Sequence, residues 1–170
     1  MKILVVVDMQ NDFVYGSLKN EEAIKIVKPL ADYIKSFDGE IIYTRDTHSK
    51  DYLNTQEGKY LPVNHCILGT KGHDIIDDLT PGDSKIINKK TFGSEDLACY
   101  IEFLNTKDKI TEIHFVGVCT DICVISNAII VKTHLPEIPV FVHKNLTAGV
   151  SVKSHENALE VMKSLQIEVI

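Results

Sequence analysis

The sequence predicts an α/β fold: a three-layer α/β/α sandwich, Rossmann-like, around a mainly parallel six-stranded sheet. Short apolar segments alternate along the chain with longer segments of helical period. The short segments are apolar at consecutive positions, which is typical of parallel strands covered by helices on both faces. Strands that alternate with helices connect through right-handed crossovers, and these build a doubly wound sheet.

Each element follows from its own pattern. The predicted strands are Ile3–Val7, Glu40–Thr44, Lys85–Asn88, Glu112–Val116 and Pro139–Val142, with Gln166–Ile170 as a candidate sixth. Apolar residues recur at helix spacing from Ile24 to Phe37, Leu97 to Leu104, Ile125 to Lys132 and Ala158 to Leu165. The exception is Asp46–Gly72, which is polar, contains glycine and has no clear period. A structureless stretch of that length in a compact domain is usually functional.

Length and charge narrow the class of protein. The 170 residues fit one domain over 1–170, and the net charge of −6 argues against a nucleic-acid partner. No apolar run approaches the roughly 20 residues of a membrane span. The first ten residues, MKILVVVDMQ, lack a small-residue cleavage site, so we expect a buried first strand and a cytoplasmic protein. Without a secretory signal, the cysteines are expected to be free thiols: Cys66, Cys99, Cys119 and Cys123.

Polar residues follow four of the predicted strands. Asp8 comes after the first strand, Asp46 and His48 after the second, Lys89 after the third, and Gly117–Cys123 after the fourth. In open parallel sheets, ligands bind beyond the carboxyl ends of the strands. The sequence therefore predicts that an acid, metal-ligand types, a cation and a thiol meet at one edge of the sheet.

Cys123 lies at a predicted strand-to-helix turn. Thr120 is a candidate helix N-cap, which would put Cys123 in the first helical turn. There the helix dipole would lower the pKa of the thiol, and free N–H groups could hold the oxyanion of a tetrahedral intermediate. The alternative is a small buried residue that packs the helix start, a common place for a free cysteine. The neighbouring strand-end residues favour the nucleophile.

Asp8 ends an apolar strand, where a carboxylate needs a partner or a function. It could cap a turn through nearby N–H groups, as many strand-end aspartates do. Lys89 offers a cationic partner, and an Asp–Lys pair beside a thiol could move a proton and stabilise the thiolate. Lys90 is equally basic, and spacing alone does not separate the two lysines.

Asp46 and His48 place two ligand-type side chains two residues apart, and His65 follows in the same loop. Imidazole and carboxylate ligands suit Zn²⁺, Fe²⁺ or Mn²⁺. Glu57 is a candidate fourth ligand. On its own an Asp-x-His pair is a weak signal, and two solvated loop residues are the alternative reading.

The remaining cysteines and histidines do not form a comparable group of metal-ligand residues. Cys66 could be a ligand beside His65, but a buried neighbour is the favoured reading, and Cys99 is expected in the core side of a helix. The other histidines are expected to be structural or surface residues: His73, His114, His134, His143 and His155.

Three motifs, taken together, resemble the isochorismatase-like cysteine hydrolases over nearly the whole chain. They are Asp8-Met-Gln-Asn-Asp-Phe13, Lys89-Lys-Thr-Phe92 and Gly117-Val-Cys-Thr-Asp-Ile-Cys-Val124. Their occurrence in this order is a specific signature. The resemblance implies the isochorismatase-like fold, and family members are commonly homo-oligomers, so we expect one here.

The same resemblance implies roles for individual residues. Asp8, Lys89 and Cys123 match the family's catalytic triad, which selects Lys89 over Lys90. The family also implies a cis peptide before Cys119, with the N–H groups of Cys119 and Cys123 forming the oxyanion hole.

The loop residues resemble those of one branch, the nicotinamidases. Asp46, His48 and His65 match the metal site of that branch, while Glu57 stands in for a further histidine. Relatives that cleave isochorismate lack this metal trio, so the match favours an amidase. In nicotinamidases the metal, expected here to be Zn with Fe or Mn as alternatives, holds the pyridine nitrogen of the substrate.

The expected substrate is a small amide, bound by Phe13, Leu61 and Phe92. Leu61 stands near the place of a second aromatic in the family's ring clamp, and the chain has no Trp. The leading prediction is hydrolysis of nicotinamide to nicotinate and ammonia through a thioester. The alternatives are an amidase for a carbamoyl or ureido compound, a catalytically silent binding protein that keeps the fold and, more weakly, a redox role for Cys119 and Cys123.

Overall fold

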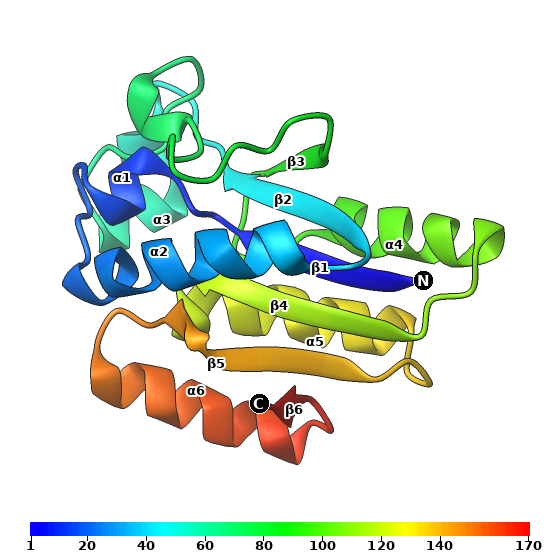
Figure 1. Ribbon diagram of the computed structural model, residues 1–170. Helices are drawn as coiled ribbons and strands as arrows, with labels where there is room; N and C mark the ends of the chain where they lie inside the picture. The colour runs from blue at the N-terminus through cyan, green and yellow to red at the C-terminus, as the bar shows by residue number, and fades with distance from the viewer.

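The computed structural model describes residues 1–170, which form a six-stranded sheet of order β3-β2-β1-β4-β5-β6 (Figure 1). Every neighbouring pair of strands is parallel, so the predicted fold class is confirmed. The strands are β1 (Lys2–Val7), β2 (Glu40–Asp46), β3 (Lys85–Lys89), β4 (Glu112–Val118), β5 (Val140–Ala148) and β6 (Glu168–Val169).

Helices cover both faces of this sheet. One face is covered by α2, and the other by α4 and α5, with α6 packed into the same core as α4 and α5 (Figure 1). The helices are α1 (Asn11–Val14), α2 (Glu21–Ser36), α3 (Gln56–Tyr60), α4 (Glu95–Lys107), α5 (Ile125–His134) and α6 (Val152–Ser164). Three single turns complete the structure: η1 (Tyr52–Asn54), η2 (Lys71–His73) and η3 (Thr120–Val124).

The central strand β1 explains why its sequence is apolar at every position. Ile3, Val5 and Val7 pack into the core under α4 and α5, whereas Leu4 and Val6 pack under α2. All five side chains are fully buried, and each burial contributes about 1.5–3 kcal/mol. Two faces covered by helices therefore require a continuous apolar run rather than an alternating one.

Side-chain caps fix where three of the four longer helices begin. The Asn20 side chain accepts hydrogen bonds from the N–H groups of Glu22 and Ala23 at the start of α2. Ser94 and Ser151 cap α4 and α6 in the same way. Each cap satisfies N–H groups that have no partner within the helix and contributes about 1 kcal/mol.

Two expectations about element bounds were wrong. The fifth strand extends to Ala148 instead of ending at Val142, and its pairing with β4 shifts register between Phe115 and Gly117. The polar composition after Val142 hid this extension, because Lys144 and Asn145 in the middle of the strand are exposed. The segment Asp46–Gly72 is not structureless: it contains η1, α3 and part of η2. Single turns are too short to produce a detectable period.

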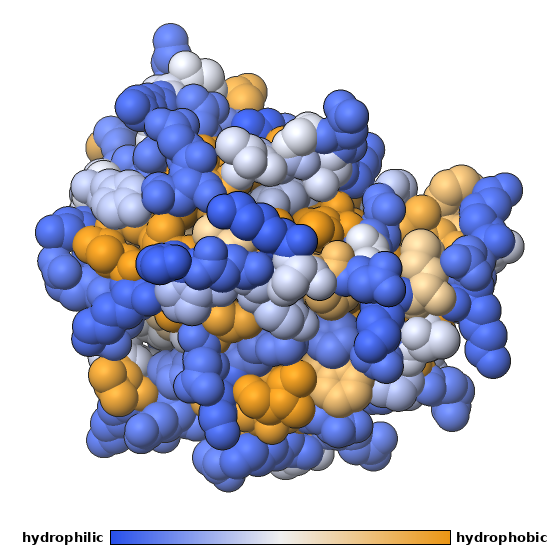
Figure 2. Space-filling model, viewed as in Figure 1, coloured by the Kyte–Doolittle hydropathy of each residue, from blue (hydrophilic) through white to orange (hydrophobic).

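The polar and apolar residues on the visible face are mixed. Figure 2 shows hydrophilic atoms over most of this face, with hydrophobic atoms in separate groups. None of the helices combines the length and the apolar character that crossing a bilayer requires.

A histidine pair under α2 makes stability depend on pH. His143 Nε2 lies 3.0 Å from His114 Nδ1 and 3.3 Å from the Tyr33 hydroxyl. Burial, with a smaller contribution from His114, lowers the pKa of His143 to about 4. In the unfolded chain a histidine has a pKa of about 6.5, so the folded state disfavours the proton. This contribution to stability is present above about pH 6.5 and is lost as the pH falls toward the folded pKa.

We therefore expect the urea midpoint of the metal-free protein to fall between about pH 7.5 and about pH 5, and to fall less in His143→Gln. Metal-free protein is used so that proton competition at metal ligands does not contribute. Equal losses in the two proteins would contradict the assignment to His143.

Candidate active site

The carboxyl ends of β1 to β4 bring the predicted strand-end residues together. Asp8 directly follows β1, while Asp46 and Lys89 are the last residues of β2 and β3 and face each other in the strand register. Cys123 lies in η3, which follows β4. The short helices α1 and α3 lie at this end of the sheet (Figure 1). Parallel topology is what makes residues far apart in sequence neighbours here.

Lys89 is the centre of the cluster. Its Nζ lies 2.6 Å from Asp8 Oδ2, 3.4 Å from Cys123 Sγ and 3.4 Å from Asp46 Oδ1. It also donates to the carbonyl of Thr91 at 3.1 Å. The lysine side chain is 1% exposed, and burial alone would lower its pKa, but the surrounding negative charges outweigh burial and raise the pKa. Lys89 is therefore a fixed buried cation, whereas Lys90 is exposed.

Asp8 is held by both of its carboxylate oxygens. Oδ1 accepts a hydrogen bond from the Thr44 hydroxyl at 2.7 Å, and Oδ2 faces Lys89. The residue is fully buried and has a φ of 48°, a left-handed conformation that costs a non-glycine residue about 1–2 kcal/mol. Burial raises the pKa of Asp8, and Lys89 only partly opposes it. A carboxylate with a raised pKa accepts a proton more readily.

The turn that carries Cys123 differs from the predicted one. Cys119, not Thr120, is the N-cap of η3, and the turn has π geometry, with the N–H groups of Ile122 and Val124 both donating to the Cys119 carbonyl. The Thr120 hydroxyl is hydrogen bonded to His155 instead of capping the turn. The expected cis peptide between Val118 and Cys119 is confirmed.

The expectation of a lowered thiol pKa was wrong as well. Burial, and then the charge of Asp8, raise the pKa of Cys123 well above its usual value, and Lys89 only partly opposes them. Burial thus favours the neutral thiol of Cys123, which lies beside the Asp8–Lys89 ion pair. Moving the proton from Cys123 to Asp8 leaves the net charge of this buried cluster unchanged. Such a transfer avoids the cost of adding an uncompensated charge to a low-dielectric site.

A second group of side chains adjoins Lys89. One ligand-type atom from each of Asp46, His48, Glu57 and His65 lies within 4.8 Å of every other. His48 Nε2 is 2.8 Å from Asp46 Oδ2 and 3.7 Å from Glu57 Oε1, while His65 Nε2 is 3.5 Å and 3.8 Å from the same two atoms. In a tetrahedral zinc site, ligand atoms lie about 3.3 Å apart, because each bond is about 2.0–2.1 Å long.

The chemistry of these donors fits a divalent metal. His48 Nε2 is buried and makes no hydrogen bond, although a carboxylate oxygen lies close to it. Such an orphaned nitrogen is expected where a cation, rather than a proton donor, completes the group. Burial alone would raise the pKa of Asp46, but His48, His65 and Lys89 together lower it, so this carboxylate stays charged and available as a ligand.

Residues without a predicted role hold the donors in place. Gln10 is fully buried, and its side chain binds the backbone of Asp46 twice. Gln10 Oε1 accepts from the Asp46 N–H at 2.7 Å, and Gln10 Nε2 donates to the Asp46 carbonyl at 2.9 Å. The Tyr52 ring lies 4.6 Å from the His48 ring and 4.8 Å from the His65 ring, between centroids. His65 Nδ1 is bonded to the Val63 carbonyl, which turns Nε2 toward the cluster. Gln10 lies in the motif Asp8–Phe13, directly after the predicted first strand. Its polar side chain at that place in the sequence was a signal that could have marked it as a site residue.

A pocket of about 290 Å³ opens beside both groups. Asp46, Glu57, His65, Cys119 and Cys123 contribute to its wall, and the rest is apolar. The expected substrate-binding residues Phe13, Leu61 and Phe92 are part of that wall, together with three residues that the sequence did not single out, Leu18, Ile122 and Val150. A mostly apolar wall with a few convergent polar groups is typical of a small-molecule site.

Two of the cysteines, Cys66 and Cys99, and the five other histidines belong neither to the pocket wall nor to the donor group. All four cysteines are free thiols, as expected, and Cys66 is buried but does not belong to the donor group. Cys99 is exposed, so its predicted core position was wrong: the buried face of α4 carries Leu97, Ala98 and Ile101 instead. The five other histidines are not in the donor group: His73, His114, His134, His143 and His155.

Comparison with known proteins identifies the family. The isochorismatase domain family matches residues 2–170. The chain belongs to the isochorismatase family. Its resemblance to the nicotinamidase branch is also supported, since its relatives include the nicotinamidase of Saccharomyces cerevisiae, which is 28% identical over 178 residues, covering 76% of this chain and 80% of the relative.

Two further members resemble the chain over nearly its full length. The nicotinamidase/pyrazinamidase of Mycobacterium tuberculosis is 26% identical over 188 residues, covering 100% of this chain and 98% of the relative. The crystal structure of the pyrazinamidase of Pyrococcus horikoshii in complex with zinc superposes with a TM-score of 0.84 at 29% identity. That match covers 99% of this chain and 98% of the other. As a member of the isochorismatase family with such relatives, the protein is an amidohydrolase.

Proposed function

We propose that the protein hydrolyses nicotinamide to nicotinate and ammonia, with Cys123 as nucleophile. One observation carries this proposal: Cys123 Sγ, Asp8 and Lys89 form one buried cluster beside the donor group of Asp46, and both border the same apolar pocket. A thiol supplied with a base and a cation can attack an amide carbonyl. An apolar pocket with a metal-ligand group at its side can bind a flat ring that carries a nitrogen donor.

In the first half of the reaction, Asp8 takes the proton of Cys123 while Lys89 stabilises the thiolate at 3.4 Å. The sulfur forms a bond to the amide carbon, and the carbonyl oxygen becomes an oxyanion. The N–H groups of Cys119 and Cys123 are the proposed donors to it. Protonated Asp8 then gives its proton to the amide nitrogen, the C–N bond breaks and ammonia leaves.

The second half releases the acid. Asp8, again a carboxylate, removes a proton from a water molecule that attacks the thioester carbon. The C–S bond breaks, and the proton held by Asp8 returns to Cys123. One water is consumed, and the cluster regains its starting charges. Lys89 keeps its proton throughout, because the carboxylates around it favour the charged form.

The proposed metal ligands are Asp46, His48, His65 and Glu57, with Zn²⁺ as the favoured ion and Fe²⁺ or Mn²⁺ as alternatives. A metal bound there would supply a Lewis acid for a ring nitrogen of the substrate. The pocket residues Phe13, Leu61 and Phe92 would hold the ring faces by apolar contact.

The direct test is ammonia release from nicotinamide by purified protein loaded with zinc, iron or manganese in turn. We expect stoichiometric ammonia and nicotinate. Absence of both products at millimolar nicotinamide with every metal would overturn the assignment of substrate.

A second candidate is an amidase of the same chemistry for another small amide, such as a carbamoyl or ureido compound. Leu61, which is 38% exposed at the pocket wall, motivates it, because an aliphatic side chain does not require an aromatic substrate. A panel of such amides with the same ammonia measurement separates the two candidates by their kcat/KM.

Glu57→Gln tests the fourth ligand. The amide keeps the size of the side chain but removes the negative charge, so we expect metal to be bound at least about tenfold more weakly, as measured by competition with a chelator. Glu102→Gln is the control, since Glu102 lies on α4 outside the donor group. Equal metal affinity in both variants would remove Glu57 from the ligand set.

A further inference from the structure

The turn that carries Cys123 has two sides with different surroundings. Cys119, Ile122 and Cys123 border the substrate pocket, whereas Thr120 and Asp121 do not. These two residues instead meet the segment that leads into α6. The Thr120 hydroxyl, which is fully buried, lies 2.8 Å from His155 Nδ1 in the first turn of α6. Asp121 Oδ1 accepts a hydrogen bond from the Val150 N–H at 3.0 Å.

The segment from Gly149 to His155 is itself fixed. Asn20, which caps α2, donates from its side chain to the Gly149 carbonyl at 2.8 Å. A Cβ at Gly149 would lie 2.9 Å from Asp121 Oδ1 and 2.9 Å from the backbone N of His155, so only glycine allows this close approach. The turn is therefore held against an anchored segment on the side opposite to the pocket.

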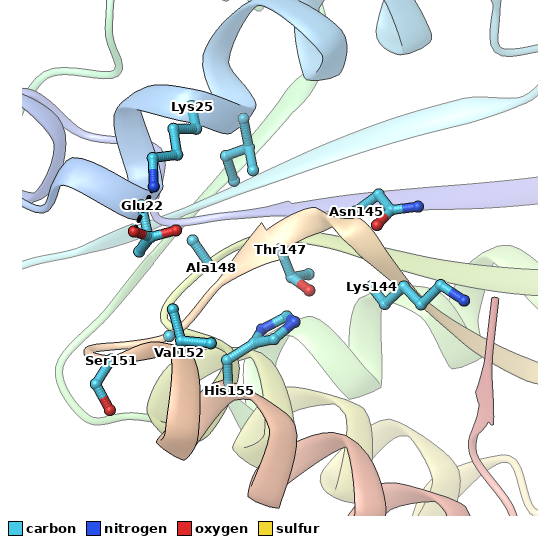
Figure 3. Close-up of a pocket in the computed structure, with 11 residues that line it drawn as sticks. Glu22, Lys25, Lys144, Asn145, Thr147, Ala148, Ser151, Val152 and His155 are labelled. Carbon is cyan, nitrogen blue, oxygen red and sulfur yellow. Dashed lines mark hydrogen bonds and ion pairs between the residues drawn. The ribbon is translucent and has the colours of Figure 1, made fainter.

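His155 also borders a separate cavity of about 200 Å³ between α2 and α6. In Figure 3 its imidazole lies close to Thr147 and Val152 on the wall of this cavity, with Ser151 beyond Val152 on one side and Lys144 on the other. The side chain is thus reached from outside, while the Thr120 hydroxyl that it holds is inaccessible. The hydrogen bond joins the outer cavity wall to the catalytic turn.

We propose that Thr120 and His155 are positioning residues that set the orientation of Cys123. The π geometry of η3 lacks the regular hydrogen bonds of an α-helix, so side-chain contacts have a large share in fixing the turn. Cys123 Sγ must stay near both Lys89 and the attacked carbon, and a misplacement of about 1 Å can lower a rate about 100-fold. The inference rests on the proposed role of Cys123 as nucleophile but not on the identity of the amide.

The test uses isosteric pairs in the full-length, metal-loaded protein. Thr120→Val removes the hydroxyl at nearly constant volume, and Thr120→Ser restores it. His155→Leu removes the ring nitrogen that bonds the Thr120 hydroxyl, while His155→Asn keeps a polar atom near the position of Nδ1. Thr147→Val is the matched control: Thr147 is equally buried and also loses one hydroxyl hydrogen bond, to the His143 carbonyl, but it has no bond to the turn.

Two readouts are used: kcat and KM for the amide, and the rate at which iodoacetamide alkylates Cys123, followed by mass spectrometry of its peptide. In Thr120→Val and His155→Leu we expect kcat to fall about 10- to 100-fold with KM changed less than about twofold, and alkylation to slow about fivefold or more. Thr120→Ser, His155→Asn and Thr147→Val should stay within about threefold of the parent protein. The double variant Thr120→Val/His155→Leu should have a kcat no lower than that of the slower single variant, because the two substitutions remove the same hydrogen bond.

The proposal is overturned if Thr120→Val and His155→Leu match Thr147→Val in both readouts. Should Thr120→Val fail to fold, His155→Leu decides, since His155 is only half-buried. Should the parent protein hydrolyse none of the tested amides, the alkylation rates still decide between positioning and a merely structural bond. Failure of the proposed substrate and failure of this inference are thus separate results.

Discussion

Replacing Cys123 by serine is expected to lower kcat by about 10⁴-fold or more, while the fold and the metal site are kept. Two thiols border the pocket, Cys119 and Cys123, and the sulfur of Cys123 lies 3.4 Å from Lys89, which in turn faces Asp8. A hydroxyl has a far higher pKa than a thiol, and Asp8 is too weak a base to remove its proton. The substitution changes one atom of a side chain that is 6% exposed at the pocket wall, so the free energy of unfolding should change little.

The measurement is single-turnover product formation, which separates chemistry from binding. Cys99→Ser is the control, because Cys99 is exposed on α4 and should leave kcat unchanged. Residual activity in Cys123→Ser within about tenfold of the parent would mean that another group attacks the carbonyl. Trapping of a covalent acyl group on Cys123 in the parent protein would support the thioester directly.

How far the sequence predicts this fold depends on the length of each element. The apolar run of β1 and the helical period of α2 are each long enough to show in the sequence, and both are found where they were expected. The turn η1 and the helix α3 are not, because three to five residues cannot display a period. The extension of β5 to Ala148 was missed because its pairing with β4 is set by tertiary contact through a register shift.

The features of the site also differ in whether the sequence predicts them. Residues at strand ends could be placed together from topology alone, because parallel strands end at one edge. The raised pKa of Cys123 could not be predicted from the sequence. Burial by neighbouring chain segments raises this pKa and overrides the lowering by the helix dipole that the predicted turn suggested. The partner of Thr120 is likewise a long-range contact: His155 lies 35 residues away in the sequence, and no local pattern pairs the two.

Removing the charge of Lys89 should have the largest effect on stability. In Lys89→Met the nearest partner of the buried Asp8 carboxylate is lost, and such an unpaired charge costs about 3–5 kcal/mol. Asp46 keeps the two histidines beside it, so Asp8 is the group left unpaired. Lys90→Met, the control, changes an exposed neighbour and should shift the free energy of unfolding by less than about 0.5 kcal/mol. Urea unfolding at neutral pH measures the free energy of unfolding of Lys89→Met and of Lys90→Met.

The double variant Asp8→Asn/Lys89→Met separates charge balance from catalysis. With both charges removed, the buried site is neutral again, and we expect more than half of the stability lost in Lys89→Met to return. Activity should stay absent, because neither the base nor the cation beside Cys123 remains. A double variant as unstable as Lys89→Met would mean that packing around the lysine stem, and not the Asp8 charge, causes the loss. An active double variant would contradict the proposed proton transfer, since Asp8 is its acceptor.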